Sequence, residues 1–313
     1  MRKSALVMAL AVLVATSVWA APPYRVFELP KFTQPPTLDG NRNTVPGEWA
    51  GTLEFECSPG QILRDGAEFG WRNLEQQSSE VSANQLVQSP GEEASVARTD
   101  ADVKSQIWQA WDDDALYYIT EVADNARDVV GGEQLVSWWE RDSMSLYVDL
   151  NNENNPGGDP DGYYVSLNVV NFMAAPQSSS PITVTLMTTV QNERQSTQDP
   201  DAIEGFTYGF RDAGDEFGGE ADYVIEGKME WDAFMRVNLY ARPTVGSLMG
   251  FTWLLVDPDG DEAYGGQIQC VAWAGGAQSE FADWLFSDQK AGPGAGTPVE
   301  ADSWGRIKAT FAQ

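Results

Sequence analysis

The chain has 313 residues, a length that permits one large domain or two small ones with a sizeable hydrophobic core. Its 47 acidic residues outnumber 19 basic ones, and the formal net charge of −28 disfavours binding to nucleic acid and to anionic membranes. Because there is no histidine, Ser-His-Asp and Cys-His nucleophile systems are excluded, as are zinc and haem held by histidine. Catalysis by carboxylates, lysine or tyrosine stays open.

The first 20 residues have the layout of a secretory signal peptide. Two basic residues precede an unbroken apolar run at 6–14, which is too short to span a bilayer. Val18 and Ala20 stand at positions −3 and −1 of a cleavage site. We therefore expect cleavage near Ala20, a secreted or periplasmic location, no membrane contact afterwards, and a single domain over 21–313.

Further along the chain, several segments alternate apolar and polar residues with a period of two, which is typical of half-buried β-strands. The clearest lie at 143–150, 163–170 and 222–231. Further strands, rich in β-branched and aromatic residues, are predicted at 116–122, 248–256 and 305–311. Clusters of Asp, Asn, Gly and Pro that favour turns separate them, at 112–114, 151–162 and 257–261.

No long segment has a helical period, and one short helical turn is expected after Trp231. Many short strands separated by turns predict an all-β fold, a two-sheet antiparallel β-sandwich of the jelly-roll or immunoglobulin-like kind with few short helices. Residues 51–100 are rich in Gly, Ser, Gln and Glu and have weak periodicity. We expect them to form an irregular insertion within the one domain.

The two cysteines of the chain are Cys57 and Cys270. In an oxidising compartment such a pair is expected to form one disulfide. Two buried free thiols are the alternative, because the sequence does not show whether the two residues approach each other.

A series of short motifs runs through the chain, and their order and spacing are informative. The motifs are Leu38-Asp39-Gly40 with Glu48-Trp49, the stretch 108–124, the stretch 139–149, the stretch 223–231, the stretch 250–257, and Trp304–Ile307 near the end. In order and spacing they resemble the family 9 carbohydrate-binding modules and, more broadly, the DOMON-like β-sandwiches. The resemblance implies a sugar-binding β-sandwich of a kind often attached to plant-polysaccharide hydrolases, with structural calcium ions.

The resemblance also implies an aromatic clamp, since indole rings stack on the flat CH faces of sugars. One wall is implied at Trp139, with Trp138 beside it. For the second wall, in the C-terminal loop, Trp284 is the best match and Trp273 the rival. Core or rim packing is the alternative for each of these tryptophans.

Polar side chains near the clamp are expected to bond sugar hydroxyls, and the candidates are Arg141, Asp142 and Gln289. Two positions depart from the family pattern. Ser145 stands where the family often has an acidic residue, and 163–167 carries no arginine where one is expected. In the family these polar residues hold sugar hydroxyls.

Two acidic loops offer the clustered oxygen ligands that calcium needs. The candidate ligands are Asp149, Asn151, Asp159, Asp161, Asp257, Asp259 and Asp261. Neither loop has the full EF-hand spacing, and solvated turns are the alternative, because Asp, Asn, Gly and Pro all favour turns. We expect a structural Ca²⁺ and, without histidine, no haem; methionine and lysine ligation of haem stays open.

The leading hypothesis is a non-catalytic protein that binds a plant-type polysaccharide or oligosaccharide and serves carbohydrate catabolism. A second is a glycoside hydrolase or lyase that uses carboxylates, for which Glu121, Asp124, Asp142 and Glu226 are candidates by position; ordinary surface acids are the alternative. A third is an acidic structural or interaction sandwich that binds calcium but no sugar. The sequence leaves the oligomeric state open.

Overall fold

The computed structural model describes residues 26–61, 86–87, 99–126, 142–150, 152, 169–175, 183–188, 205–235, 241–257, 267–270 and 281–295. The predicted signal peptide at 1–20, most of the predicted strand at 163–170 and the predicted strand at 305–311 lie outside these ranges. No helix in the described part of the chain is long and apolar enough to cross a membrane.

The described residues include thirteen strands and the short helix α3, and residues 59–61 are also helical. In chain order these are β1 (Val26–Phe32), β2 (Leu53–Cys57), β3 (Leu86–Val87), β4 (Val103–Trp111), β5 (Ala115–Asp124), β6 (Ser143–Asp149), β7 (Val169–Ala175), β8 (Thr183–Thr188), β9 (Phe206–Gly214), β10 (Asp222–Glu230), α3 (Trp231–Met235), β11 (Leu248–Val256), β12 (Gln267–Gln269) and β13 (Ala282–Ala291). The strands predicted at 143–150, 222–231, 116–122 and 248–256 are confirmed as β6, β10, β5 and β11, and α3 is the expected helical turn.

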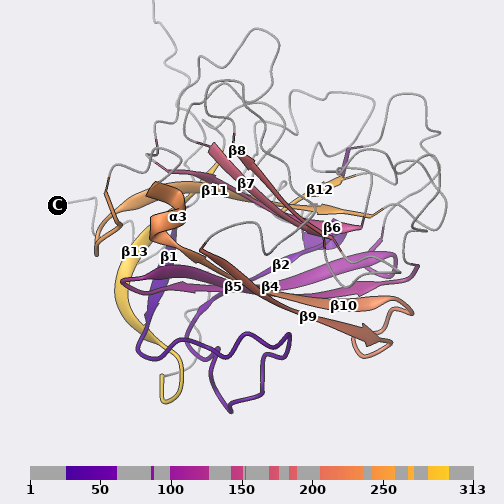
Figure 1. The fold of residues 1–313 in the computed structure, drawn as a ribbon. Helices are drawn as coiled ribbons and strands as arrows, with labels where there is room; N and C mark the ends of the chain where they lie inside the picture. Colours follow the sequence, from indigo (N-terminus) through magenta and orange to yellow (C-terminus); the bar gives the residue numbers. More distant parts are fainter. Residues whose placement is uncertain are drawn as a thin grey trace, which may run out of the picture.

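The strands lie in two layers that face each other (Figure 1). One layer contains β2, β4, β5, β10 and β9, and the other contains β6, β7, β8, β11 and β12. Strands β13 and β1 join the layers in a continuous hydrogen-bonded order, β8-β7-β6-β11-β13-β1-β4-β5-β10-β9. The predicted two-sheet sandwich is therefore confirmed. Its pairs are antiparallel except at the join, where β1 runs parallel to both β13 and β4.

The hydrophobic core lies between the layers because the apolar positions of each alternating strand point inward. Strand β6 contributes Met144, Leu146 and Val148, and β11 contributes Phe251 and Trp253. The other face of these two strands is also buried, with Tyr147, Leu254, Val256 and Phe281 in a separate apolar cluster. The alternating sequence of β6 predicts a strand with one buried face. In the structure, however, both faces of β6 are buried.

The expectation that residues 51–100 form an irregular insertion is wrong at its start. Strand β2 pairs with β4 in an unbroken antiparallel register from Leu53 to Cys57. Leu53, Phe55 and Cys57 are buried in the main core. The short strand β3 also pairs with β12. Residues 62–85 and 88–98 lie outside the described part of the chain.

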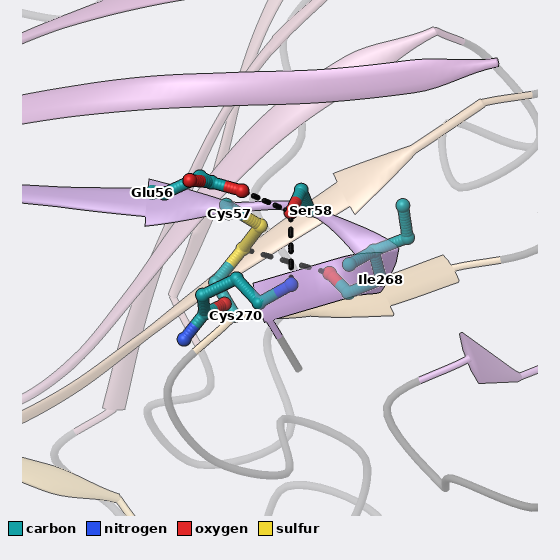
Figure 2. The surroundings of a disulfide bond; sticks show 6 residues. Glu56, Cys57, Ser58, Ile268 and Cys270 are labelled. Carbon is teal, nitrogen blue, oxygen red and sulfur yellow. Dashed lines mark hydrogen bonds between the residues drawn. A yellow bond between two sulfur atoms is a disulfide. The ribbon is translucent and has the colours of Figure 1, made fainter. Parts of the chain in front are cut away.

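Cys57 and Cys270, paired in the sequence-based prediction, form a disulfide (Figure 2). Their Cα atoms are 4.9 Å apart, although the residues are 213 positions apart in the chain. Cys57 ends β2, and Cys270 directly follows β12, which pairs with β11. The bond therefore fastens one layer of the sandwich to the other.

Candidate functional site

Three buried carboxylates meet at one end of the sandwich. Asp124 is the last residue of β5, Asp142 immediately precedes β6, and Asp257 immediately follows β11. One carboxylate oxygen of each lies within 4.8 Å of those of the other two. All three side chains are almost fully buried, with at most 1% exposed. We call these three residues the acidic cluster.

The topology of the sheet explains the acidic cluster. Strands β6 and β11 are antiparallel, with Ser143 opposite Val256, so the residues just beyond that pair, Asp142 and Asp257, emerge side by side. Asp124 comes from the other layer. The acidic cluster therefore spans both layers at the end of the sandwich.

The donor set of the acidic cluster fits a hard cation. Carboxylates this close and this deeply buried repel one another unless a cation or protons lie between them. Calcium prefers oxygen ligands and commonly takes several carboxylates from different parts of a chain. Of the seven calcium ligands predicted from sequence, Asp257 belongs to this cluster, whereas Asp124 was not expected to bind metal and Asp142 was assigned to sugar.

Asp149 lies at the opposite end of the β6–β11 pair, where it faces Gly250. Near it are Asp283 and Asn152, and Asn152 has a left-handed backbone with a φ of 50°. Burial is the main cause that raises the pKa of Asp283 to about 6; a hydrogen bond from Asn152 lowers it, and the charge of Asp149 raises it further. Asp149 and Asp257 therefore do not share one ion. The remaining predicted ligands, Asn151, Asp159, Asp161, Asp259 and Asp261, lie outside the described residues.

The assignment of Trp284 to a sugar clamp is wrong. Its side chain is fully buried in the core, 0% exposed, and its ring stacks on Phe251 with 4.4 Å between the centroids and 11° between the planes. The indole Nε1–H donates a hydrogen bond of 3.1 Å to Oε1 of Gln109. Trp284 therefore ties β13 to β4 across the interior and offers no face to a ligand.

The other predicted sugar contacts are not brought together in the described part of the structure. Asp142 is buried in the acidic cluster. Gln289 lies late in β13, beyond the part that pairs with β11, and its amide donates to Glu28. Strand β13 pairs with the start of β11, whereas Asp142 lies beside the end of β11. Asp142 and Gln289 are therefore at different ends of the sheet. Trp138, Trp139, Arg141 and Trp273 lie outside the described residues.

Among the candidate catalytic acids, Glu226 has a carboxylate that holds other parts of the fold in place. Its carboxylate accepts hydrogen bonds from the backbone of Asp39 at 2.8 Å and Gly40 at 3.0 Å, and from the indole of Trp49 at 3.0 Å. These contacts fasten the motifs Leu38-Asp39-Gly40 and Glu48-Trp49 onto the outer face of β10. The backbone of the turn at 39–40 also approaches β9 closely at Gly209. The lack of side chains permits this contact, since a Cβ on Gly209 would lie 2.5 Å from the nitrogen of Gly40, which has a φ of 74°.

Glu121 is also engaged, because the Nε of Arg42 donates to its carboxylate at 3.0 Å. Its side chain points to the outer face of β5, whereas Asp124 belongs to the buried acidic cluster. Glu226 contacts the turn at 39–40 from β10. Asp124 and Asp142 do lie close together, but both are buried in the acidic cluster and have no open cleft between them for a sugar. The described residues give no support to a glycosidase mechanism.

The two-layer fold with its acidic cluster is that of a β-sandwich domain. A family model described as carbohydrate family 9 binding domain-like matches residues 80–287, and the chain belongs to that family. The match begins before β3 and ends within β13, so it includes all three residues of the acidic cluster. No curated protein sequence matches the chain.

The solved structures that match the chain share little sequence with it. A family 9 carbohydrate-binding module from Caldicellulosiruptor kristjanssonii in complex with cellotriose is 12% identical, with a TM-score of 0.46, and the match covers 84% of this chain and 94% of that one. The same kind of module from this organism in complex with glucose is 13% identical, with a TM-score of 0.45 and coverage of 84% and 96%. A putative carbohydrate-binding protein from Bacteroides uniformis is 9% identical, with a TM-score of 0.47 and coverage of 85% and 100%.

Proposed function

We propose that this chain is a non-catalytic carbohydrate-binding protein that acts outside the cytoplasm on neutral, plant-type polysaccharides or oligosaccharides. The observation that carries the proposal is membership of the carbohydrate family 9 binding domain-like family, across a match of residues 80–287. The environments of Glu226 and Glu121 described above favour binding over hydrolysis by a pair of carboxylates.

The proposed ligand site lies at the end of the sandwich that carries the acidic cluster. Asp142 is fixed there, and Trp139 is three residues earlier in the chain. With Trp284 in the core, Trp273 or Trp138 supplies the second aromatic wall in this proposal.

Affinity electrophoresis in gels that contain xylan or soluble cellulose derivatives tests the binding. We expect retention of the wild-type chain by at least one neutral polysaccharide and markedly weaker retention of Trp139→Ala. The purified chain should release no reducing sugars from the same polymers. Unretarded migration in every gel contradicts the proposal, and release of reducing sugars favours the hydrolase hypothesis.

The proposal includes a structural calcium ion held by the acidic cluster. Asp124, Asp142 and Asp257 would supply carboxylate ligands, and the ion would neutralise their charges and hold the ends of β5, β6 and β11 together. Binding to the folded state alone raises stability by mass action.

Thermal melting tests the calcium proposal. We expect calcium to raise the melting temperature of the wild-type chain and a chelator to lower it, with a much smaller response in Asp142→Asn. Asp215→Asn, at an exposed turn between β9 and β10, is the matched control and should respond as wild type. Equal responses of Asp142→Asn and wild type contradict the assignment of the ion to the acidic cluster.

A second candidate function is an acidic interaction sandwich that binds calcium but no sugar. The burial of Trp284 favours it, because one wall implied by the family resemblance is lost to the core. The two candidates differ in the gel experiment and agree in the melting experiment.

A further inference from the structure

A groove of about 380 Å³ lies on the outer face of the layer that contains β2, β4 and β5. Its lining includes Glu56 of β2, Lys104 and Gln106 of β4, Glu121 of β5, Asp100, and Phe217 from the turn between β9 and β10. Small-molecule sites usually measure roughly 300–1,000 Å³, so the groove suits a small ligand. It lies on the face of β5 opposite to that of Asp124, and no residue of the acidic cluster lines it.

Several polar side chains of the groove are held in place by neighbouring residues. Gln106 donates to Glu54 at 3.1 Å, and Asp100 accepts from the backbone of Gly60 at 2.7 Å. Glu56 accepts from Ser58, whose hydroxyl in turn accepts from the backbone of Gln61 next to the disulfide (Figure 2). Because these contacts fix the side chains before a ligand arrives, little conformational entropy would be lost on binding.

The charges of the groove nearly balance. The lining carries the three carboxylates of Glu56, Asp100 and Glu121 and the ammonium of Lys104. Beside the lining, the guanidinium of Arg42 pairs with Glu121 and lies 4.1 Å from the ring centroid of Trp108. One excess negative charge disfavours an anionic ligand. The combination of acceptors, an ammonium donor and an amide suits a neutral molecule with many hydroxyls.

Phe217 adds an apolar surface to this polar lining. Its ring is half-buried, and its backbone is held by a hydrogen bond to Asp222. A flat CH face of a pyranose can pack on such a ring while its hydroxyls reach carboxylates and amides. An aromatic face beside hydroxyl-binding groups is the combination expected of a sugar subsite.

We propose that this groove is a second ligand site, which binds one or two rings of a neutral pyranose sugar. The site is separate from the one proposed near Trp139, since it is built from β2, β4, β5 and the β9–β10 turn. Phe217 packs against the sugar ring, while Lys104 and Gln106 donate to its hydroxyls and Glu56 and Glu121 accept from them.

Calorimetric titration with cellobiose and xylobiose in a Trp139→Ala background tests the groove alone. We expect binding to persist in this background and to weaken roughly tenfold in Phe217→Ala, as for the loss of one good aromatic contact. Lys104→Ala removes an exposed ammonium without disturbing the core and should weaken binding several-fold. Lys228→Ala, on neighbouring β10 outside the groove, is the control and should change nothing.

The melting temperature of each variant shows whether it is folded. If Phe217→Ala unfolds, Lys104→Ala still decides the question. Failure of the Trp139→Ala chain to bind any neutral disaccharide, or binding unaffected by both groove variants, overturns the second site. If Trp139→Ala leaves binding unchanged while the groove variants abolish it, the groove stands and the site near Trp139 fails.

Discussion

Trp284 shows how a side chain that looks suited to a ligand can instead hold a core together. Its ring stacks on Phe251 of β11, and its Nε1–H bonds Gln109 of β4. The sequence around it, Ala282 to Phe286, alternates in and out of the core, and Trp284 takes an inward position. The composition of the segment cannot reveal this, because an inward and an outward tryptophan differ only in strand register.

Replacement of Trp284 by phenylalanine should lower stability and leave sugar affinity intact. The stacked ring is kept, but the buried Oε1 of Gln109 loses its donor, which costs about 1–3 kcal/mol, and the smaller ring leaves a void. Urea unfolding measures the loss, and titration with sugar below the transition measures affinity. A folded Trp284→Phe chain whose sugar binding has disappeared would contradict the core assignment.

Glu226 is a buried acid whose pKa is raised in the folded chain. Burial raises its pKa to about 7, against the opposing effect of hydrogen bonds from Gly40, Asp39 and Trp49. In the unfolded chain its pKa returns to about 4.5. Between these values the folded state holds more protons than the unfolded state, so its contribution to stability is full below pH 4.5 and is lost as the pH rises towards 7.

We therefore expect the wild-type chain to melt at a higher temperature at pH 5 than at pH 8, with a contribution from Glu226 of up to roughly 3 kcal/mol. Glu226→Gln cannot ionise and should flatten the pH dependence in this window. The comparison of the two chains isolates Glu226 from other carboxylates, including Asp283, whose raised pKa acts in the same direction. Identical pH profiles of the two chains would show that Glu226 does not titrate in this range.

Among the secondary-structure elements, the strands with a regular apolar pattern were predicted from the sequence. The strands without such a pattern were missed. Strands β5, β6, β10 and β11 were found because their apolar residues recur with a period of two or run unbroken. Strand β1 carries Pro30 and a register shift between Leu29 and Lys31, so its pattern is interrupted. Strand β2 alternates clearly from Leu53 to Cys57, but the polar composition of the following residues concealed it.

The acidic cluster illustrates what a linear sequence leaves out. Its members are distant in the chain, and only the antiparallel β6–β11 register and the packing of the two layers bring them together. Asp257 was predicted as a metal ligand because it opens an acidic loop. Asp124 gave no such signal, since an acid at the end of a strand is also ordinary turn chemistry.

The disulfide between β2 and the residue after β12 should contribute strongly to stability because it closes a loop of 213 residues. In the chain-entropy model this corresponds to roughly 5 kcal/mol. We expect the Cys57→Ala/Cys270→Ala chain to unfold at a markedly lower urea concentration than the oxidised wild type. The same midpoint before and after reduction of the wild type would indicate that the bond does not constrain the unfolded chain.

For the molecule as a whole, the net charge of −28 is expected to disfavour acidic carbohydrates relative to neutral ones. Long-range repulsion lowers the rate and affinity of association with polyanions, and salt screens it. At low ionic strength we expect retention by neutral xylan or cellulose derivatives and none by polygalacturonate or alginate in the same gels. Stronger retention by the acidic polymers would show that local contacts overcome the field of the protein.

The carbohydrate-binding account depends on a sugar ring being held next to the end of the sandwich that bears the acidic cluster. Its most direct test is calorimetric titration of the wild-type chain, in a buffer that contains calcium, with cello- and xylo-oligosaccharides, alongside Trp139→Ala. The account predicts saturable heats for the wild type with at least one oligosaccharide and a markedly weakened interaction in the variant. A complete lack of heat with every oligosaccharide, from a chain that melts cooperatively, would contradict it.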